Sequence, residues 1–383
     1  MNNPDCFALN THLHIVAFDI PFPANYGGVI DVFYKIRSLH HAGAKIHLHC
    51  FEYQREQTPE LNSLCEEVNY YPRSSGLLPN LSARPYIVMT RRSEQLVLNL
   101  MKDEYPIIFE GIHTCYALDD ERLRTRFRVY RESNIEHHYY YQLFCSEKQL
   151  IPRLFFLIES LRLHLFQQQL KHASLMLTVS EEDTTYLQKK FPGHIVFCLP
   201  SFHREDEVTC YPGRGNYAIY HGNLSVAENI RAAEFLIKKV WTETMPELVI
   251  AGLNPPKRLL DVASGVGNIR FVINPTDSEM YNLIHQAHLN ILVTFQATGL
   301  KLKLLNALFN GRFCLVNPAM VKGTSLSDLC IIATEPEEFR YRILETFSIE
   351  FTSLEINRRV SILKKHYSNQ KNCKLLSDLL NLF

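Results

Sequence analysis

The stretch from Leu13 to Phe51, LHIVAFDIPFPANYGGVIDVFYKIRSLHHAGAKIHLHCF, decides the fold of this chain. It begins with a short apolar run, Leu13 to Phe18, and continues into a loop rich in Pro and Gly. Apolar residues then recur at steps of three and four as far as Leu39, and Gly43 ends this helical pattern. A second apolar run, Ala44 to Phe51, follows. Strand, loop, helix and strand form a βαβ unit, which predicts parallel strands joined by a right-handed crossover.

The same alternation continues along the chain. Further predicted strands cover 106–110, 128–130, 175–179, 194–199, 217–220, 247–251, 269–273, 290–293 and 313–316, and further predicted helices cover 151–172, 228–240, 278–287 and 300–309. A polar segment without apolar period, 201–216, interrupts the series. We therefore expect an α/β protein with two doubly wound, Rossmann-like domains that face a cleft. The first domain covers 1–200, the linker 201–216 and the second domain 217–354, and a helical segment, 355–383, is expected to pack back on the first domain.

The composition is that of an ordinary globular protein, with 46% hydrophobic and 21% charged residues among 383. Because 40 basic residues balance 40 acidic ones, we expect no nucleic-acid partner. The ten cysteines are scattered without a C-x-x-C motif, which favours reduced thiols in a cytoplasmic protein. Residues 1–11 lack the pattern of a signal peptide, and the apolar helix 151–172 carries too many charges to cross a bilayer.

Peripheral contact with the inner face of the cytoplasmic membrane stays open. Arginines at 122, 124, 126 and 128, together with the apolar helix 151–172, could dock on an anionic surface. Acidic residues at 119–121 dilute that charge, so we favour a buried core helix for 151–172.

In an open parallel sheet, ligands bind outside the carboxyl ends of the strands, so the residues directly after each strand are the candidates for a site. Gly27 and Gly28 would let the backbone approach a phosphate at a helix start, although a plain tight turn explains them as well. Glu110 and His113 follow the strand 106–110 and could position a sugar hydroxyl or transfer a proton. A purely structural role is the alternative for both.

Two further loops contain candidate ligand-binding residues. The segment from Arg131 to Tyr141 crowds donors, acceptors and aromatic rings after a strand, which suits a polyhydroxylated ligand; a polar helix start is the alternative. Adjacent histidines rarely face one ion, so we expect no metal at His137 and its neighbour.

In the other loop, Lys301 and Lys303 lie at a predicted helix start. A positive charge there is unfavourable toward the helix dipole and costs the helix about 0.3 to 1 kcal/mol of stability. Two lysines at this position favour the binding of an anionic ligand. The alternative is that both lysines are solvated.

At these loops the chain resembles the GT-B fold glycosyltransferases, in particular the retaining glycosyltransferase family 4 and its bacterial members that build surface polysaccharides. The resemblance covers nearly the whole chain. Its landmarks, in chain order, are the loop with Gly27 and Gly28, Glu110 to His113, Arg131 to Tyr140, Thr178 to Ser180, Gly222 to Ser225 with Asn229, and Gly299 to Gly311.

The resemblance implies transfer of a sugar from a nucleotide-sugar donor in the second domain to a glycan or lipid-linked acceptor in the first, with no metal or other cofactor. The expected catalytic residues are Glu110, His113 and Glu136. The expected donor-binding residues are Gly27, Gly28, Gly222, Asn223, Thr298, Gly299, Lys301, Lys303 and Asn306. The expected acceptor-binding residues are Arg131, Asn134 and His137.

The chain also departs from the pattern of this family. Asn223 and Glu228 stand where members commonly carry an Arg and a Lys for the diphosphate, and Thr298 and Asn306 stand where a pair of glutamates is usual. Two alternatives therefore stay open beside a glycosyltransferase: a noncatalytic protein that binds a nucleotide sugar or glycan, and a sugar-nucleotide epimerase of the same fold.

Overall fold

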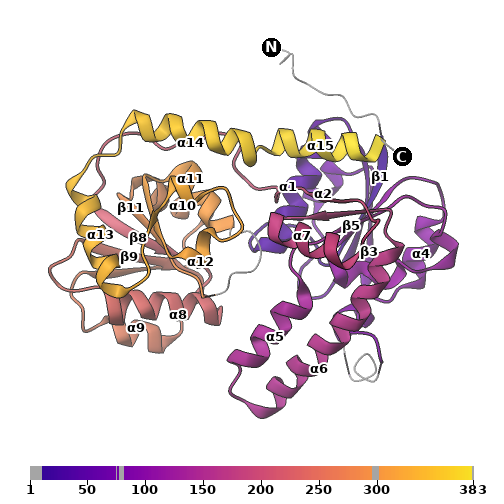
Figure 1. Ribbon diagram of the computed structural model, residues 1–383, viewed down its shortest axis with the longest axis horizontal. Coiled ribbons are helices and arrows are strands. Elements are labelled where there is room, and N and C mark those ends of the chain that lie inside the picture. The colour runs from indigo at the N-terminus through magenta and orange to yellow at the C-terminus, as the bar shows by residue number, and fades with distance from the viewer. Residues whose placement is uncertain (1–10, 75, 77–81, 296–301, 382–383) are drawn as a thin grey trace. The chain divides into compact units, whose positions relative to one another are not determined.

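The computed structural model of the chain describes residues 11–74, 76, 82–295 and 302–381. They form two compact units, shown in Figure 1. The first unit comprises the chain up to His203 and again from Asn369 onward, and the second comprises Arg204 to Ser368. The first boundary falls inside the segment expected as a linker.

The first unit is built around a sheet of seven parallel strands in the order β3-β2-β1-β4-β5-β6-β7. Its strands are β1 (His12–Ala17), β2 (Lys45–Glu52), β3 (Glu67–Pro72), β4 (Ile107–Glu110), β5 (Arg128–Arg131), β6 (Leu175–Thr178) and β7 (Val196–Cys198). Its helices are α1 (Gly27–His41), α2 (Pro59–Leu64), α3 (Tyr86–Met89), α4 (Glu94–Leu100), η2 (Ile112–Ala117), η3 (Glu121–Leu123), α5 (Glu136–Ser146), α6 (Leu150–Phe166), η4 (Gln167–His172), α7 (Glu181–Lys190) and α15 (Asn369–Asn381).

The second unit has six parallel strands in the order β10-β9-β8-β11-β12-β13. They are β8 (Tyr217–His221), β9 (Glu247–Gly252), β10 (Ile269–Ile273), β11 (Leu289–Leu292), β12 (Phe313–Val316) and β13 (Ile331–Ile332). The helices are α8 (Ala227–Phe235), η5 (Leu236–Val240), α9 (Lys257–Ala263), α10 (Asp277–Gln286), α11 (Leu302–Asn310), α12 (Pro318–Val321), η6 (Ser327–Leu329), α13 (Pro336–Ser348) and α14 (Ser353–His366).

Both sheets are doubly wound, because the strand order reverses direction at β1 in the first unit and at β8 in the second. The predicted class of two doubly wound α/β domains is confirmed. The predicted segment 355–383 is divided between the units, since α14 belongs to the second and α15 to the first. There the thiol of Cys373 in α15 lies 3.6 Å from the carbonyl oxygen of Ser38 in α1.

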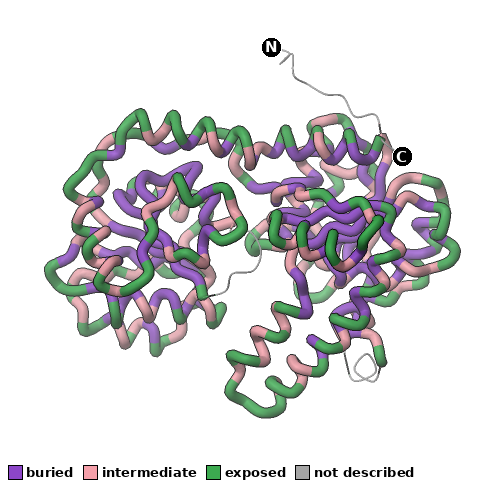
Figure 2. The backbone as a smooth tube through the Cα atoms, in the orientation of Figure 1, coloured by how far each residue is buried: buried purple, intermediate pink, exposed green. Residues whose placement is uncertain are grey.

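Helices cover both faces of each sheet, which explains why the strands are apolar throughout rather than alternating. In the first unit, Val16 and Phe109 enter a core on one face, while Ile15 and Ile108 enter a core on the other. Figure 2 shows the same division in both units, with buried strands inside and exposed helix faces outside.

Helix α6 corrects one expectation. It packs against α5, and in Figure 1 this hairpin extends away from the sheet of the first unit. Leu150 is 81% exposed and Ile151 is 86% exposed, so α6 is not a buried core helix. Three of the arginines expected to form a basic surface cluster do not present a free charge there. Arg126 and Arg128 are buried, and Arg122 forms ion pairs with Glu94 and Asp120. In the described part of the chain, no helix has the length and apolar character that crossing a bilayer requires.

Candidate active site

The carboxyl ends of the strands nearest the switch point of the first unit gather the charged and polar residues that the sequence predicts there. The ends of β4 and β5 lie side by side, because Glu110 pairs with Arg131 in the parallel register. Helix α1, which follows β1, supplies two further charged side chains, Asp31 and Lys35, four residues apart on one helix face. The fold thus brings residues that are 100 positions apart in sequence into contact.

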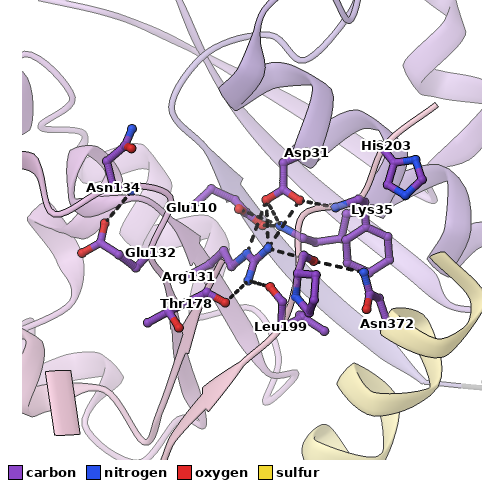
Figure 3. Close-up of polar contacts among 12 residues, drawn as sticks. Asp31, Lys35, Glu110, Arg131, Glu132, Asn134, Thr178, Leu199, His203 and Asn372 are labelled. Carbon is purple, nitrogen blue, oxygen red and sulfur yellow. Dashed lines mark hydrogen bonds and ion pairs between the residues drawn. The ribbon is translucent and has the colours of Figure 1, made fainter. Parts of the chain in front are cut away.

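These four side chains form a buried ionic network (Figure 3). Lys35 donates to both oxygens of Glu110 at 2.7 and 2.8 Å and lies 3.3 Å from the carboxylate of Asp31. Asp31 also accepts from Arg131 at 3.3 Å and from the backbone N–H of Phe202 at 2.6 Å. All four residues are at most 4% exposed. Two cations therefore neutralise two carboxylates in the interior.

The electrostatics of the two carboxylates differ. Burial raises the pKa of Glu110, and the nearby Asp31 adds to this while Lys35 opposes it. Burial acts in the same direction on Asp31, but there the charges of Arg131 and Lys35 prevail and lower its pKa. Asp31 is consequently the firmly ionised member of the network.

This network contains two of the residues predicted from the sequence. Glu110, the expected catalytic residue, and Arg131, an expected acceptor-binding residue, are both buried with their polar atoms engaged. Arg131 additionally donates to the carbonyl oxygens of Thr178, at 3.0 Å, and of Leu199. Both side chains are buried, and their hydrogen bonds connect the strand ends to α1 and to the segment after β7. Asp31 and Lys35 were not among the residues predicted from the sequence. The pattern that could have identified them is a pair of charged residues on an otherwise apolar face of a predicted helix.

His113 lies beyond the end of β4, after Gly111 has turned the backbone with a φ of 72°. Its ring centroid is 5.3 Å from that of Phe18, and its Nδ1 is buried and has no hydrogen-bond partner in the described chain. Burial and the nearby guanidinium of Arg91 lower its pKa well below the usual value, so the imidazole is neutral. A neutral imidazole can donate a hydrogen bond from one nitrogen and accept one at the other.

Gly27 and Gly28 form the start of α1, where neither an acidic residue in the first turn nor a side-chain cap occupies the free backbone N–H groups. The two glycines differ. A Cβ on Gly28 would lie 2.5 Å from the ring of Phe18, whereas a Cβ on Gly27 would have open space. Gly28 therefore permits Phe18 to approach the helix start, next to His113.

Glu136, the first residue of α5, is the predicted catalytic residue with the most unusual environment. Burial raises its pKa to about 7, against the opposing charge of Arg91 and a hydrogen bond from the side chain of Asn134. A carboxyl group that titrates near neutral pH is suited to proton transfer. Asn134 also reaches Glu132, whose carboxylate accepts from the Asn134 N–H at 3.2 Å and from the Tyr130 hydroxyl at 2.7 Å.

His137, an expected acceptor-binding residue, lies among the side chains of α5, α6 and α7. Its ring packs against His138, at 4.2 Å between centroids, and against His164 of α6 at 4.9 Å. Its Nε2 lies 3.5 Å from the hydroxyl of Tyr186 in α7. Helical geometry explains this placement, because consecutive residues on a helix point about 100° apart, so His137 cannot share the direction of Glu136.

The second unit has its own cluster at the carboxyl end of β8. Gly222 follows this strand, and a Cβ there would lie 3.2 Å from the side-chain amide of Asn229. Asn223 folds its side chain back onto Ser225, accepting from the backbone N–H at 3.0 Å and from the hydroxyl at 2.7 Å. Asn229 in turn donates to the carbonyl oxygen of Asn223 at 2.9 Å. The loop between β8 and α8 is therefore held by local hydrogen bonds from side chains to backbone.

Lys303, in the first turn of α11, reaches this cluster. Its ammonium donates to the side-chain oxygen of Asn229 at 3.2 Å and lies 5.5 Å from the ring centroid of Tyr220. Burial, with Lys303 nearby, lowers the pKa of His221 to about 3. Glu228 accepts from the hydroxyl of Thr294, which lies two residues after the end of β11. One ammonium and one carboxylate thus lie close to the strand ends at the switch point of this unit.

The remaining expected donor-binding residues are less informative. Thr298, Gly299 and Lys301 lie outside the described residues. Asn306 lies within α11, where its side-chain oxygen accepts from Asn310 at 2.8 Å. A cation that the sequence reasoning missed is Arg231 of α8, whose guanidinium lies 4.0 Å from the ring centroid of Phe295, and no motif marks it.

In the part of the chain described here, no group of three or more His, Cys, Asp or Glu residues is arranged to hold a metal ion. The groups that the carboxyl ends of the strands in the two units present are ammonium and guanidinium groups, backbone N–H groups, a neutral imidazole and a carboxyl group with a pKa of about 7.

The two doubly wound units, with polar residues at the carboxyl ends of their strands, define the class of fold. The chain has the GT-B glycosyltransferase fold. Sucrose-phosphate synthase from Thermosynechococcus elongatus matches with a TM-score of 0.70 and 12% identity, over 97% of this chain and 98% of that chain. HepE of Anabaena in complex with UDP-glucose matches with a TM-score of 0.62 and 11% identity, over 97% and 100%. WaaG, a glycosyltransferase involved in lipopolysaccharide biosynthesis, matches with a TM-score of 0.63 and 12% identity, over 96% and 99%.

The sequence has a more similar relative. An uncharacterized 44.6 kDa protein in the cps region of Klebsiella pneumoniae is 23% identical over 356 residues, which cover 86% of this chain and 89% of that protein. No protein-family model matches the chain. The comparisons thus support the predicted fold, together with structural similarity to glycosyltransferases that use nucleotide sugars.

Proposed function

We propose that this protein transfers a sugar from a nucleotide-sugar donor to a glycan or lipid-linked acceptor. The observation that carries the proposal is Lys303 in the first turn of α11. Its ammonium contacts Asn229 of α8, the helix that follows β8, in a GT-B fold. HepE, a similar structure, was solved with UDP-glucose. We keep the expected cytoplasmic location, retention at the anomeric carbon and independence of metal as parts of the same proposal.

The second unit is the proposed donor side. When a nucleoside diphosphate leaves the anomeric carbon, negative charge grows on the phosphates. A group that is more strongly attracted to this transition state than to the ground state speeds the reaction. Lys303, with Lys301 from outside the described residues, is the proposed source of positive charge, and Gly222 lets the backbone of the loop approach the donor. Asn223 and Asn306 are proposed to contact the donor through their amides.

The first unit is the proposed acceptor side. We assign proton transfer to Glu136, because its pKa of about 7 allows it to accept a proton from an acceptor hydroxyl at neutral pH. His113 is the proposed hydrogen-bonding group for the transferred sugar. Glu110 and Arg131 are positioning residues that act through the strand ends, and the free N–H groups at Gly27 and Gly28 are proposed to bind phosphate oxygens.

A ligand screen and one matched pair of variants test the proposal. Calorimetry with UDP-, GDP- and ADP-sugars should find a donor, and transfer to an extracted glycolipid should follow by mass spectrometry. Lys303→Ala should lower kcat by about 10²- to 10³-fold, as removal of one charge-stabilising donor does. Lys239→Ala, at an exposed lysine on η5 of the same unit, should leave kcat unchanged. Equal effects of both variants would contradict the assigned role, and added EDTA should not change the rate.

A specific observation favours a second candidate, a noncatalytic nucleotide-sugar binder. Glu228 places a carboxylate next to Thr294, close to where the diphosphate is proposed to lie, and like charge there would weaken a phosphate-stabilising site. Donor binding without transfer or hydrolysis would support this candidate. An epimerase would instead isomerise the sugar of the donor in the absence of any acceptor, which NMR of the recovered nucleotide sugar would reveal.

A further inference from the structure

Helix α6 carries a stripe of large aliphatic side chains that the first unit leaves uncovered. The stripe consists of Leu150, Ile151, Leu154, Ile158, Leu161 and Leu165, whose exposed fractions run from 40% to 86%. On a helix with 3.6 residues per turn, these positions lie along one side. At 1.5 Å per residue, the stripe is about 22 Å long. A continuous apolar surface of this kind marks an interaction site.

The opposite side of α6 is fixed to the rest of the first unit. Glu159 is fully buried and accepts from the backbone N–H of Tyr86 at 2.7 Å. Ser160 donates to the carbonyl oxygen of His137 at 2.8 Å, and the ring of Phe156 packs against α5. The helix cannot turn its stripe inward without breaking these buried contacts, so the exposure of the stripe belongs to the fold.

The charges around the stripe are predominantly basic. Residues 147–172 contain four basic side chains and two acidic ones, which gives a net charge of +2. Arg153 is exposed on one border of the stripe, and Lys148 and Lys171 are exposed near its two ends. Of the two acidic residues, Glu159 is buried and paired with Arg162 at 2.9 Å, and Glu147 accepts from backbone N–H groups at the start of α6.

We propose that the α6 stripe attaches this protein to an anionic lipid bilayer, with the helix lying in the plane of the headgroups. An interfacial helix buries its apolar face about 5 to 10 Å deep and is drawn to anionic lipids by flanking Lys and Arg, which is the pattern of this helix. Protein interfaces instead concentrate their binding energy in Trp, Tyr and Arg, and the stripe holds only Leu and Ile. A second copy would bring two basic borders together across a two-fold axis, at a cost in repulsion.

Attachment does not depend on sugar transfer, so the two proposals are tested separately. The full chain is sedimented with vesicles of equimolar phosphatidylglycerol and phosphatidylcholine, and with vesicles of phosphatidylcholine alone. We expect partitioning into the anionic vesicles to be about tenfold stronger or more, since each Lys or Arg near the surface contributes roughly a factor of five. The double variant Ile158→Asp/Leu161→Asp should lose at least about a hundredfold, because two aliphatic side chains no longer enter the bilayer.

Two controls accompany this comparison. Leu344→Asp/Leu354→Asp changes two leucines of the second unit that are 52% and 76% exposed, and it should bind vesicles as the wild type does. Arg153→Gln should weaken binding to anionic vesicles only. Circular dichroism melting should give the same Tm for all variants, since every changed side chain is exposed.

Three results would overturn the proposal. One is wild-type protein that stays in the supernatant with both kinds of vesicle. Another is an Ile158→Asp/Leu161→Asp variant that binds as tightly as the wild type. The third is a dimer in sedimentation velocity that this variant abolishes, without vesicle binding, because the stripe would then be covered by a second copy.

Discussion

Replacement of Lys35 by Met is the most direct perturbation of the buried network in the first unit. The Lys35 ammonium lies 2.7 and 2.8 Å from the two oxygens of Glu110, and its side chain is 1% exposed. Met has a similar length and fills the same space, but it donates no hydrogen bond. Glu110 would then be buried without its cation, and removing one partner of a buried ion pair costs about 3 to 5 kcal/mol.

Urea unfolding followed by circular dichroism measures this cost. With a urea dependence of about 2 to 3 kcal/mol per molar for a unit of this size, the midpoint for the first unit should fall by about 1 to 2 M. Lys45→Met is the matched control. Lys45 pairs with Glu66 at 3.0 Å, but the two side chains are 49% and 47% exposed, so water already solvates both charges. This variant should leave the midpoint unchanged.

A double variant separates the lost ion pair from a general packing effect. In Lys35→Met/Glu110→Gln the interior no longer holds an unpaired carboxylate, so the double variant should be more stable than Lys35→Met alone. Two results would refute the reasoning: a midpoint for Lys35→Met equal to that of Lys45→Met, or a double variant less stable than the single one.

Three further predictions follow from single contacts. Gly28→Ala should destabilise the first unit by about 1 to 3 kcal/mol in urea, because its Cβ would lie 2.5 Å from the ring of Phe18, whereas the neighbouring Gly27→Ala should be neutral or stabilising. The rate of the proposed sugar transfer should rise as pH increases through about 7, and Glu136→Gln should remove this dependence in a pH–rate profile. Burial lowers the pKa of His14 and of His49, so below pH 6.5 the unfolded chain binds more protons and stability should fall, by up to about 1.4 kcal/mol per pH unit for each proton. Urea midpoints between pH 7.5 and 5.5 that do not fall would contradict this last prediction.

The strands and helices were predictable because their signals are local. The strand predicted at 106–110 is β4 at Ile107–Glu110, and the strand at 269–273 is β10 over the same residues. The hydroxyl of Ser180 caps α7 by accepting from the backbone N–H of Asp183 at 3.1 Å, and acidic residues fill the first turn that follows. Continuous apolar runs and capping residues act within a few positions, so one sequence is enough to find them.

The side-chain environments were not predictable, because they depend on residues far apart in the chain. From the sequence, Glu110 at a strand end is equally compatible with a catalytic role and with a role as an ion-pair partner. The choice depends on Lys35, which lies 75 positions earlier. The apolar period of α6 likewise predicts that one face of the helix is apolar. It does not predict whether another element of the fold covers that face. Lys303 could be recognised as a cation at a helix start, but its contact with Asn229, 74 positions earlier, requires the fold.

The network also bears on why the first unit keeps four charges in its interior. Replacing buried ion pairs by apolar side chains of similar volume often leaves a protein as stable or makes it more stable, so stability alone does not explain them. Arg131 links the ends of β5 and β6 to the segment after β7 through the carbonyl oxygens of Thr178 and Pro200, and Lys35 links α1 to the end of β4. Hydrogen bonds have fixed directions, whereas apolar contacts tolerate sliding. The network therefore sets the relative positions of the strand ends from which His113 and Glu136 project, and an apolar replacement of all four side chains should cost activity even where it preserves the fold.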